Sequence, residues 1–297
     1  MRRASQLRRF LRPTAAIVAA HAVSAAAGGS ARFPFCQIVD RRPDPTAGLE
    51  WSLTPSRAIE GGGRFGLAEN RGWGEIYFFD TGRGEAALSA EARVWVPTEG
   101  GPPALPELLA HLRLGLRWDL RGYNGVTFRL EAEPGLYAEG AALERGLDVP
   151  FSVIGIQSFT DRFSGFAGLR FRPRDDRIAD PALGLRWSPA DPLILDAGYP
   201  VSRALLRLTS WGTISAGFEV NRRYEFALEE SDERERFRYR ESRYFAAAAV
   251  AIAEYWSVEL RGGRVAGRDY GFEAGPDSGI REMEGSYFVA LGIAGAF

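Results

Sequence analysis

Histidine and cysteine, the residue types that most often carry catalytic or metal chemistry, are rare in this chain, which has two histidines and one cysteine. Beyond the N-terminal export segment described below, only His111 and Cys36 remain, and this inventory excludes zinc, Cys–His and multi-histidine sites. A Ser–His–acid arrangement could use only His111, and no nucleophile-elbow glycine motif supports it. We therefore predict no enzyme, no metal site and no cofactor, with His111 as a structural side chain and Cys36 as an isolated thiol.

Charged side chains at every second position of apolar segments suggest a different chemistry. Between Leu112 and Leu120 the even positions are apolar, whereas the odd positions carry Arg113, Arg117 and Asp119. Such alternation is typical of a β-strand, whose successive side chains point to opposite faces. In a membrane barrel the apolar face contacts lipid and the polar face lines the interior. The residues predicted to line the interior are Arg113, Arg117, Asp119, Arg129, Glu131, Glu133, Arg170, Arg172, Arg186, Arg203, Arg207, Glu219, Glu259 and Arg261.

The clearest hairpin joins the strand at 112–120 to a second alternating strand at 126–133 through a turn that contains Asn124-Gly125. An Asn-Gly turn between two alternating segments is a strong hairpin signal. We predict that Leu120 faces Val126, a register that places Arg117 opposite Arg129. Because diagonal neighbours lie within reach of long side chains, Asp119 and Glu131 would offset the repulsion. Arg117 and Arg129 would then form the most electropositive point of the interior wall.

The last segment, Ser286–Phe297, alternates in the same way, and its apolar phase is Tyr287, Val289, Leu291, Ile293 and Phe297, with a break at Gly295. A terminal strand that ends in an aromatic residue is what bacterial outer-membrane barrels use to close against their first strand and to be recognised by the barrel assembly machinery. We assign those five residues to barrel closure and to the assembly signal. The alternative is an edge strand of a soluble β-sandwich, since apolar alternation is common in half-buried strands.

Counted from Glu85, the alternating segments predict an all-β, antiparallel up-and-down transmembrane barrel of about 12 strands, with a range of 10–14. Long connections at 97–108, 134–150, 223–239 and 267–284 alternate with short ones such as 121–125 and 253–255, as external loops and periplasmic turns do. Aromatic residues expected at a membrane interface lie beside short connections: Trp118, Tyr123, Trp187, Trp211, Tyr255 and Trp256.

The N-terminus predicts export. Arginines precede an apolar run at Thr14–Ala27, and small residues follow with possible cleavage after Ala27 or Ala31, which is the pattern of a signal peptide at 1–31. The apolar run is short compared with the roughly 20 residues that a membrane-spanning helix needs. Residues 32–84 are either an additional barrel hairpin or a periplasmic or plug-like extension. Residues 85–297 form the barrel, which we place in the bacterial outer membrane after export through the inner membrane.

Several short motifs resemble a bacterial family. They are Leu105-Pro106-Glu107, Pro134-Gly135-Leu136-Tyr137, the segment Pro181–Pro189 and Tyr199-Pro200-Val201-Ser202-Arg203. From about Glu85 to the C-terminus the chain resembles an uncharacterised family of outer-membrane β-barrels that is defined only as a domain of unknown function. The resemblance implies a barrel and an envelope location, and it implies no activity.

The formal net charge of −1 does not indicate nucleic-acid binding, which typically needs a strongly basic surface. The expected partners are outer-membrane lipid and the barrel assembly machinery, and the oligomeric state is open. The charged interior predicts a porin-like passive channel for small polar or anionic solutes. Because small barrels can fill the same space with paired charges, the alternative is a structural or adhesion barrel with a blocked lumen that acts through its external loops.

Overall fold

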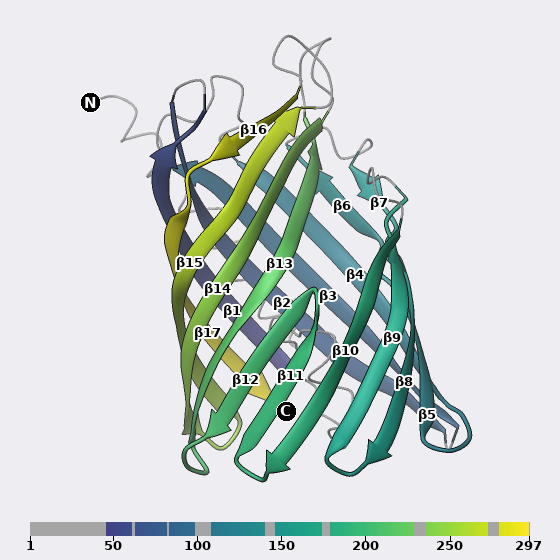
Figure 1. Cartoon of the computed structure of the whole chain (residues 1–297). Helices are drawn as coiled ribbons and strands as arrows, with labels where there is room; N and C mark the ends of the chain where they lie inside the picture. The colour runs from purple at the N-terminus through teal and green to yellow at the C-terminus, as the bar shows by residue number, and fades with distance from the viewer. Residues whose placement is uncertain are drawn as a thin grey trace.

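The computed structural model describes residues 46–60, 63–81, 83–98, 108–139, 146–173, 179–228, 236–272 and 279–296 (Figure 1). Within these ranges the regular structure is β, and no helix is long and apolar enough to cross a membrane. The predictions about the signal peptide, Cys36 and Phe297 concern residues outside the described ranges.

One antiparallel sheet closes on itself as a barrel, because β1 pairs with β17, for example at Leu49↔Ile293. The strands are β1 Thr46–Ala58, β2 Arg64–Thr81, β3 Gly84–Thr98, β4 Leu109–Arg121, β5 Val126–Ala132, β6 Gly135–Ala138, β7 Leu147–Asp148, β8 Phe151–Thr160, β9 Phe163–Phe171, β10 Ala179–Ala190, β11 Leu193–Tyr199, β12 Val201–Arg207, β13 Gly212–Ala227, β14 Arg236–Ala253, β15 Trp256–Phe272, β16 Gly279–Met283 and β17 Ser286–Ala296. The segments β5 and β6, β7 and β8, and β16 and β17 share wall positions, so the described wall has 14 strands.

The predicted strand number of about 12 is therefore too low, although 14 lies within the predicted range. The two additional strands are β1 and β2, and β17 closes on β1 rather than on the segment that starts at Glu85. Apolar alternation in β2 is weak because its apolar residues Phe65 and Leu67 are buried, whereas Gly72 and Gly74 occupy the opposite phase; the sequence therefore leaves residues 32–84 open between an additional hairpin and an extension. A strand with small residues on its outer face carries no apolar alternation to detect.

The two ends of the barrel differ. Thr46 pairs with Ala296 at the end that we call the inner end, and tight turns such as Arg121–Val126 and Ala253–Trp256 lie there. The six aromatic residues predicted beside short connections are all exposed, from 37% for Trp256 to 93% for Tyr123. At the opposite, outer end most connections are longer, but strands are also longer than predicted, because 223–227, 236–239 and 267–272 belong to β13, β14 and β15.

The outer face of the barrel carries an apolar band. Residues of this band that are half-exposed are Leu112, Leu114, Leu116, Phe128, Leu183, Leu185, Val289 and Leu291. Such a band would aggregate in water unless lipid or detergent covered it.

We expect Leu116→Arg to lower the free energy of unfolding by roughly 2–4 kcal/mol, because a charge in the middle of a lipid-facing band is costly. Leu116 is 49% exposed and its neighbours Leu114 and Leu88 are also exposed. Urea unfolding in lipid vesicles measures the effect, and unchanged stability would show that this face does not contact hydrocarbon.

The predicted register of the β4–β5 hairpin is wrong by two residues. Leu120 pairs with Phe128 rather than with Val126, so Arg117 faces Glu131 and Asp119 faces Arg129. The turn is centred one residue later than predicted, at Asn124, because Arg121 pairs with Thr127 and the Gly122 amide donates to the Val126 carbonyl at 2.8 Å. A slip of two residues keeps each side chain on its face, so apolar alternation could not distinguish the two registers. The observed register brings opposite charges together instead of two guanidiniums.

At the outer end the wall closes a second, narrower ring. Strand β6 pairs with β4 on one edge, and on the other edge Ala138 pairs in parallel with Ala227 of β13. The Glu139 amide also donates to the Ala227 carbonyl at 2.9 Å. A bridge between Ile59 and Met283 joins the end of β1 to β16. The outer ends of β1–β4, β6 and β13–β16 thus surround a smaller space, while β8–β12 form a lower part of the wall (Figure 1).

Candidate functional site

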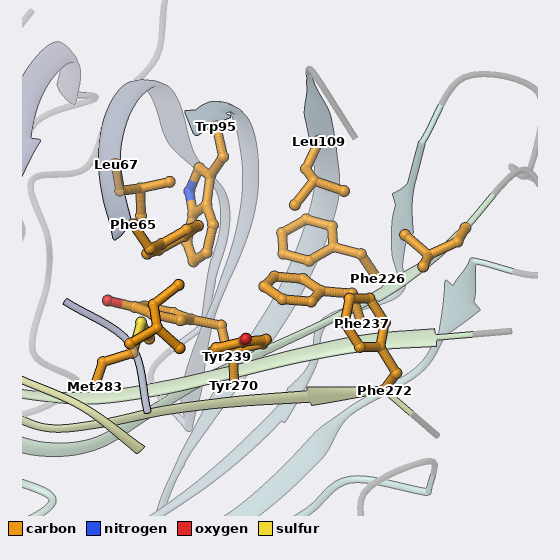
Figure 2. Packing of buried hydrophobic residues seen from close by; sticks show 12 residues of the cluster. Phe65, Leu67, Trp95, Leu109, Phe226, Phe237, Tyr239, Tyr270, Phe272 and Met283 are labelled. Atoms are coloured by element: carbon orange, nitrogen blue, oxygen red, sulfur yellow. The ribbon is translucent and has the colours of Figure 1, made fainter. Parts of the chain in front are cut away.

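The narrow outer ring is filled by apolar side chains, which we call the aromatic cluster (Figure 2). Its buried members are Ile59, Phe65, Leu67, Trp95, Leu109, Phe226, Leu228, Phe237, Tyr239, Tyr270, Phe272 and Met283. Trp95 lies at its centre, with ring centroids 4.1 Å from Tyr224, 5.2 Å from Phe226 and 5.7 Å from Tyr239. The cluster occupies the outer end of the interior between β2–β4 and β13–β15.

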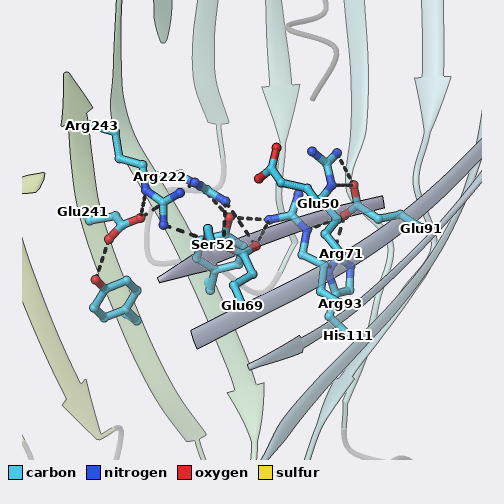
Figure 3. Close-up of polar contacts among 12 residues, drawn as sticks. Glu50, Ser52, Glu69, Arg71, Glu91, Arg93, His111, Arg222, Glu241 and Arg243 are labelled. Atoms are coloured by element: carbon cyan, nitrogen blue, oxygen red, sulfur yellow. Dashed lines mark hydrogen bonds and ion pairs between the residues drawn. The ribbon is translucent and has the colours of Figure 1, made fainter. Parts of the chain in front are cut away.

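A second set of interior side chains lies next to the aromatic cluster, nearer the inner end of the barrel, and we call it the charge layer (Figure 3). It consists of Glu69 and Arg71 on β2, Glu91 and Arg93 on β3, Arg222 on β13, and Glu241 and Arg243 on β14. Glu91 contacts three guanidiniums: Arg71 Nε at 2.7 Å, Arg93 Nε at 2.8 Å and Arg113 Nη2 at 3.3 Å. Glu91 is only 5% exposed, so these contacts compensate a buried carboxylate.

Glu69 is the second carboxylate shared by several guanidiniums, and it connects opposite walls. Arg222 Nη2 on β13 donates to Glu69 Oε1 at 3.3 Å, and Arg93 Nη1 on β3 donates to the same oxygen at 3.2 Å. The Tyr224 hydroxyl accepts from Arg222 Nε at 2.6 Å and also from Arg93. Since β13 and β2 are separated by four other wall positions in the closed sheet, these bonds cross the interior.

On β14 and β15, consecutive side-chain hydrogen bonds link Arg243, Glu241, Tyr239 and Arg268. Arg243 Nε donates to Glu241 Oε1 at 2.5 Å, and the Tyr239 hydroxyl donates to Glu241 Oε2 at 2.5 Å. Arg268 Nε on β15 donates to the Tyr239 hydroxyl at 3.2 Å. Glu241 is fully buried, so its contacts couple the charge layer to the aromatic cluster above it.

His111 belongs to the same region, where its ring lies between an aromatic ring and a carboxylate. It is 4% exposed, its ring stacks on Tyr137 at a centroid distance of 4.0 Å, and its Nδ1 lies 3.7 Å from Glu91 Oε1. Within the described part of the chain neither imidazole nitrogen has a hydrogen-bond partner, so no serine is paired with it. The side chain packs between the charge layer and the aromatic cluster.

Most residues predicted to line the interior lie in Arg–carboxylate pairs. Arg117 Nη2 contacts Glu75 Oε1 at 2.9 Å, and Arg129 Nε contacts Asp119 Oδ1 at 2.7 Å. Both guanidiniums are therefore neutralised, and the prediction that they form the most electropositive point of the wall is wrong. The other pairs are Arg113–Glu133 at 3.0 Å, Arg186–Asp196 at 2.7 Å, Arg203–Asp196 at 3.5 Å and Arg261–Glu259 at 2.5 Å.

The remaining predicted residues are less enclosed. Glu131 accepts from the Ser152 hydroxyl at 3.4 Å, and Arg170 and Glu219 are half-buried. Arg172 follows the end of β9, and Arg207 is exposed at the inner end of β12. Of the residues assigned to closure, Tyr287, Val289 and Leu291 are exposed on β17, and Ile293 is half-buried where it pairs with Leu49.

The prediction missed much of the charge layer, including Glu69, Arg71 and Arg222. Glu91 and Arg93 do alternate with Ala90, Ala92 and Val94, which is the signal that could have placed them inside. The segment around Arg222 gave no such signal, because a register irregularity between Glu219 and Arg222 shifts the phase of β13.

The structure is a closed antiparallel barrel with an apolar outer band, exposed aromatic residues at one end and charged side chains inside. These features define the class of membrane-spanning β-barrels of the bacterial outer membrane. No protein-family model matches the sequence, and no curated protein matches it. The resemblance to a family of unknown function accordingly stays a prediction.

Among solved structures, the chain is similar to an outer-membrane channel from Pseudomonas putida F1, with a TM-score of 0.49 and 11% identity over 88% of this chain and 98% of that chain. It is also similar to the KdgM porin in complex with disordered oligogalacturonate, with a TM-score of 0.40 and 8% identity over 84% and 99% of the two chains. The NanC porin gives a TM-score of 0.40 and 8% identity over 84% and 100%.

Proposed function

We propose that the protein is a porin-like outer-membrane channel that passes small polar or anionic solutes through a narrow interior. The observation that carries this proposal is the exposure of charged side chains inside the barrel. Arg113 and Glu133 are ion-paired, yet their side chains are 25% and 15% exposed, and that of Glu259 is 35% exposed. Solvent therefore reaches the polar interior beside the charge layer.

The path follows the wall that the aromatic cluster does not cover. The cluster draws its side chains from β2–β4, β6 and β13–β16, whereas β5 and β8–β12 contribute none. On these latter strands Arg186 and Arg203 both contact the carboxylate of Asp196. Interior cations favour anions in water-filled barrels.

Planar-bilayer recording of the purified barrel tests this function. We expect stepwise current in potassium chloride, with a reversal potential that shows anion preference in a salt gradient. Folding is checked independently by the heat-dependent band shift on a denaturing gel. A correctly folded barrel that conducts no current would contradict the channel.

The aromatic cluster favours one second candidate, a structural or adhesion barrel with a blocked lumen. Its buried rings fill the narrow outer ring, and paired charges in small barrels conduct little. A silent folded barrel that binds cells or matrix through its outer loops would support this candidate.

A further inference from the structure

The outer parts of β13, β14 and β15 lie side by side and extend beyond the apolar band (Figure 1). On β14 the outward residues are apolar from Ile252 to Tyr244, a length that matches the about 9–11 residues of a membrane-crossing strand. The next outward residues toward the outer end are Ser242 and Arg240. The strand therefore leaves the hydrocarbon near Tyr244.

Tyrosines mark the same boundary on both sides of β15. In the register of the wall, Tyr244 of β14 pairs with Arg264 of β15, and Arg264 pairs with Tyr287 of β17. Both tyrosines are exposed, and the ring of Phe218 on β13 has its centroid 6.2 Å from that of Tyr244. Tyrosine side chains are enriched at the membrane–water interface. Arg264 thus lies at the level of the lipid head groups.

Beyond the band, the first charged outward side chain on each of these three strands is an arginine. These residues, which we call the interface arginines, are Arg223 on β13, Arg240 on β14 and Arg264 on β15. Arg223 and Arg240 are directly opposite each other in the register. Like charges in this position are unfavourable, so a bound anion would stabilise this part of the wall.

The nearest carboxylates leave two of the interface arginines accessible. Asp269 of β15 accepts from Arg240 Nε at 2.7 Å, and Glu282 of β16 follows Asp269 in the register. The Arg240 side chain is nevertheless 42% exposed. Arg264 is exposed and makes no ion pair within the described part of the chain.

Farther from the band the outward charges are balanced. Glu225 contacts Arg236 and Arg238, each at 3.5 Å. Glu284, which precedes β17, makes no ion pair among the described residues. The positive charge that is least compensated by carboxylates is therefore that of Arg264, next to the apolar band.

Small residues separate Arg240 from Arg264 on the outer face. Ser242, Ala266 and Gly267 lie between them, where a register irregularity interrupts the pairing of β14 with β15. A Cβ on Gly267 would meet only the Ser242 hydroxyl, at 3.9 Å. The surface between the two guanidiniums is thus low. Guanidiniums donate paired hydrogen bonds that match the geometry of a phosphate group.

We propose that the interface arginines bind the phosphate groups of a phosphorylated glycolipid in the outer leaflet, whose acyl region contacts Tyr244 and Tyr287. Continuity with the apolar band favours a lipid over a free anion, because a molecule bound here contacts both surfaces at once. The inference goes beyond the proposed channel and does not depend on it, since the lipid binds to the outside of the wall.

Native mass spectrometry of the folded full chain in a neutral detergent tests this site. The probe is diphosphorylated lipid A, and the same lipid without phosphate is its counterpart. We expect the Arg240→Gln/Arg264→Gln variant to lower the occupancy of the phosphorylated lipid by at least about tenfold. The matched control Arg121→Gln/Arg162→Gln removes two exposed, carboxylate-paired arginines from the inner end and should keep the wild-type occupancy. Arg240→Lys/Arg264→Lys should retain most of the binding, because it keeps both charges.

The heat-dependent band shift confirms that each variant is folded. If the double glutamine variant fails to fold, Arg264→Gln alone decides the matter, since Arg264 makes no ion pair in the described chain. Equal occupancy in the glutamine variant and its control, or equal retention of the phosphate-free lipid, would overturn the site. Displacement of the lipid by excess inorganic phosphate would also overturn it, because the arginines would then bind free phosphate. A folded barrel that retains the lipid and conducts no current supports the site and contradicts only the channel.

Discussion

Glu91→Gln should lower the free energy of unfolding by about 3–5 kcal/mol, because removing one member of a buried ionic network leaves uncompensated charge behind. Glu91 accepts from Arg71 and Arg93 and lies 3.3 Å from Arg113. Arg93 and Arg113 keep contacts with Glu69 and Glu133, respectively. Arg71 loses its ion pair with Glu91, so we expect most of the lost unfolding free energy to come from the uncompensated charge of Arg71.

The measurement is urea unfolding in lipid vesicles, with Glu85→Gln as the matched control. Glu85 pairs with Arg121, whose side chain is 50% exposed, and such surface pairs contribute at most about 1 kcal/mol. Adding Arg71→Met to Glu91→Gln should recover part of the loss, since the double variant removes both members of the pair. Equal stabilities for Glu91→Gln and Glu85→Gln would show that the charge layer does not stabilise the barrel.

The sequence was sufficient to predict the barrel wherever the outer face is apolar. In β4, β5 and β10 exposed apolar residues alternate with buried or half-buried ones, and the predicted strands lie close to the observed ones. The outer parts of β13 and β14 follow the opposite rule, because Phe226 and Phe237 are buried while Arg223 and Arg238 lie in the other phase. Because these parts of the strands have aromatic side chains inside and charged side chains outside, apolar alternation on the outer face predicts them as loops.

The interior site was harder to predict than the wall. Alternation assigns a residue to a face but says nothing about which strands face one another across the interior, and contacts such as Arg222 to Glu69 join residues far apart in sequence. The register of β4 and β5 shows the same limit at short range, since registers that differ by two residues keep every face unchanged. Only the three-dimensional closure of β17 on β1 brings β2 and β13 into a common space.

Trp95→Ala should have the second large effect, a loss of about 3–5 kcal/mol of unfolding free energy together with increased conductance. The Trp95 indole is 2% exposed and contacts Tyr224, Phe226 and Tyr239 at the centre of the aromatic cluster. Its removal leaves a cavity that the closed narrow ring cannot collapse to fill. Because the cluster fills the narrow outer ring beside the proposed path, the same cavity should admit water and ions and widen that path.

Two substitutions make the Trp95 prediction specific. Trp95→Phe keeps an aromatic ring and removes an indole N–H that has no hydrogen-bond partner in the described part of the chain, so it should cost much less than Trp95→Ala. Trp118→Ala removes the same side chain from the outer face, where it is 46% exposed, and should leave conductance unchanged. If Trp95→Ala folds and conducts like the wild-type barrel, the rings do not limit the current along β5 and β8–β12, and the charge layer limits it instead.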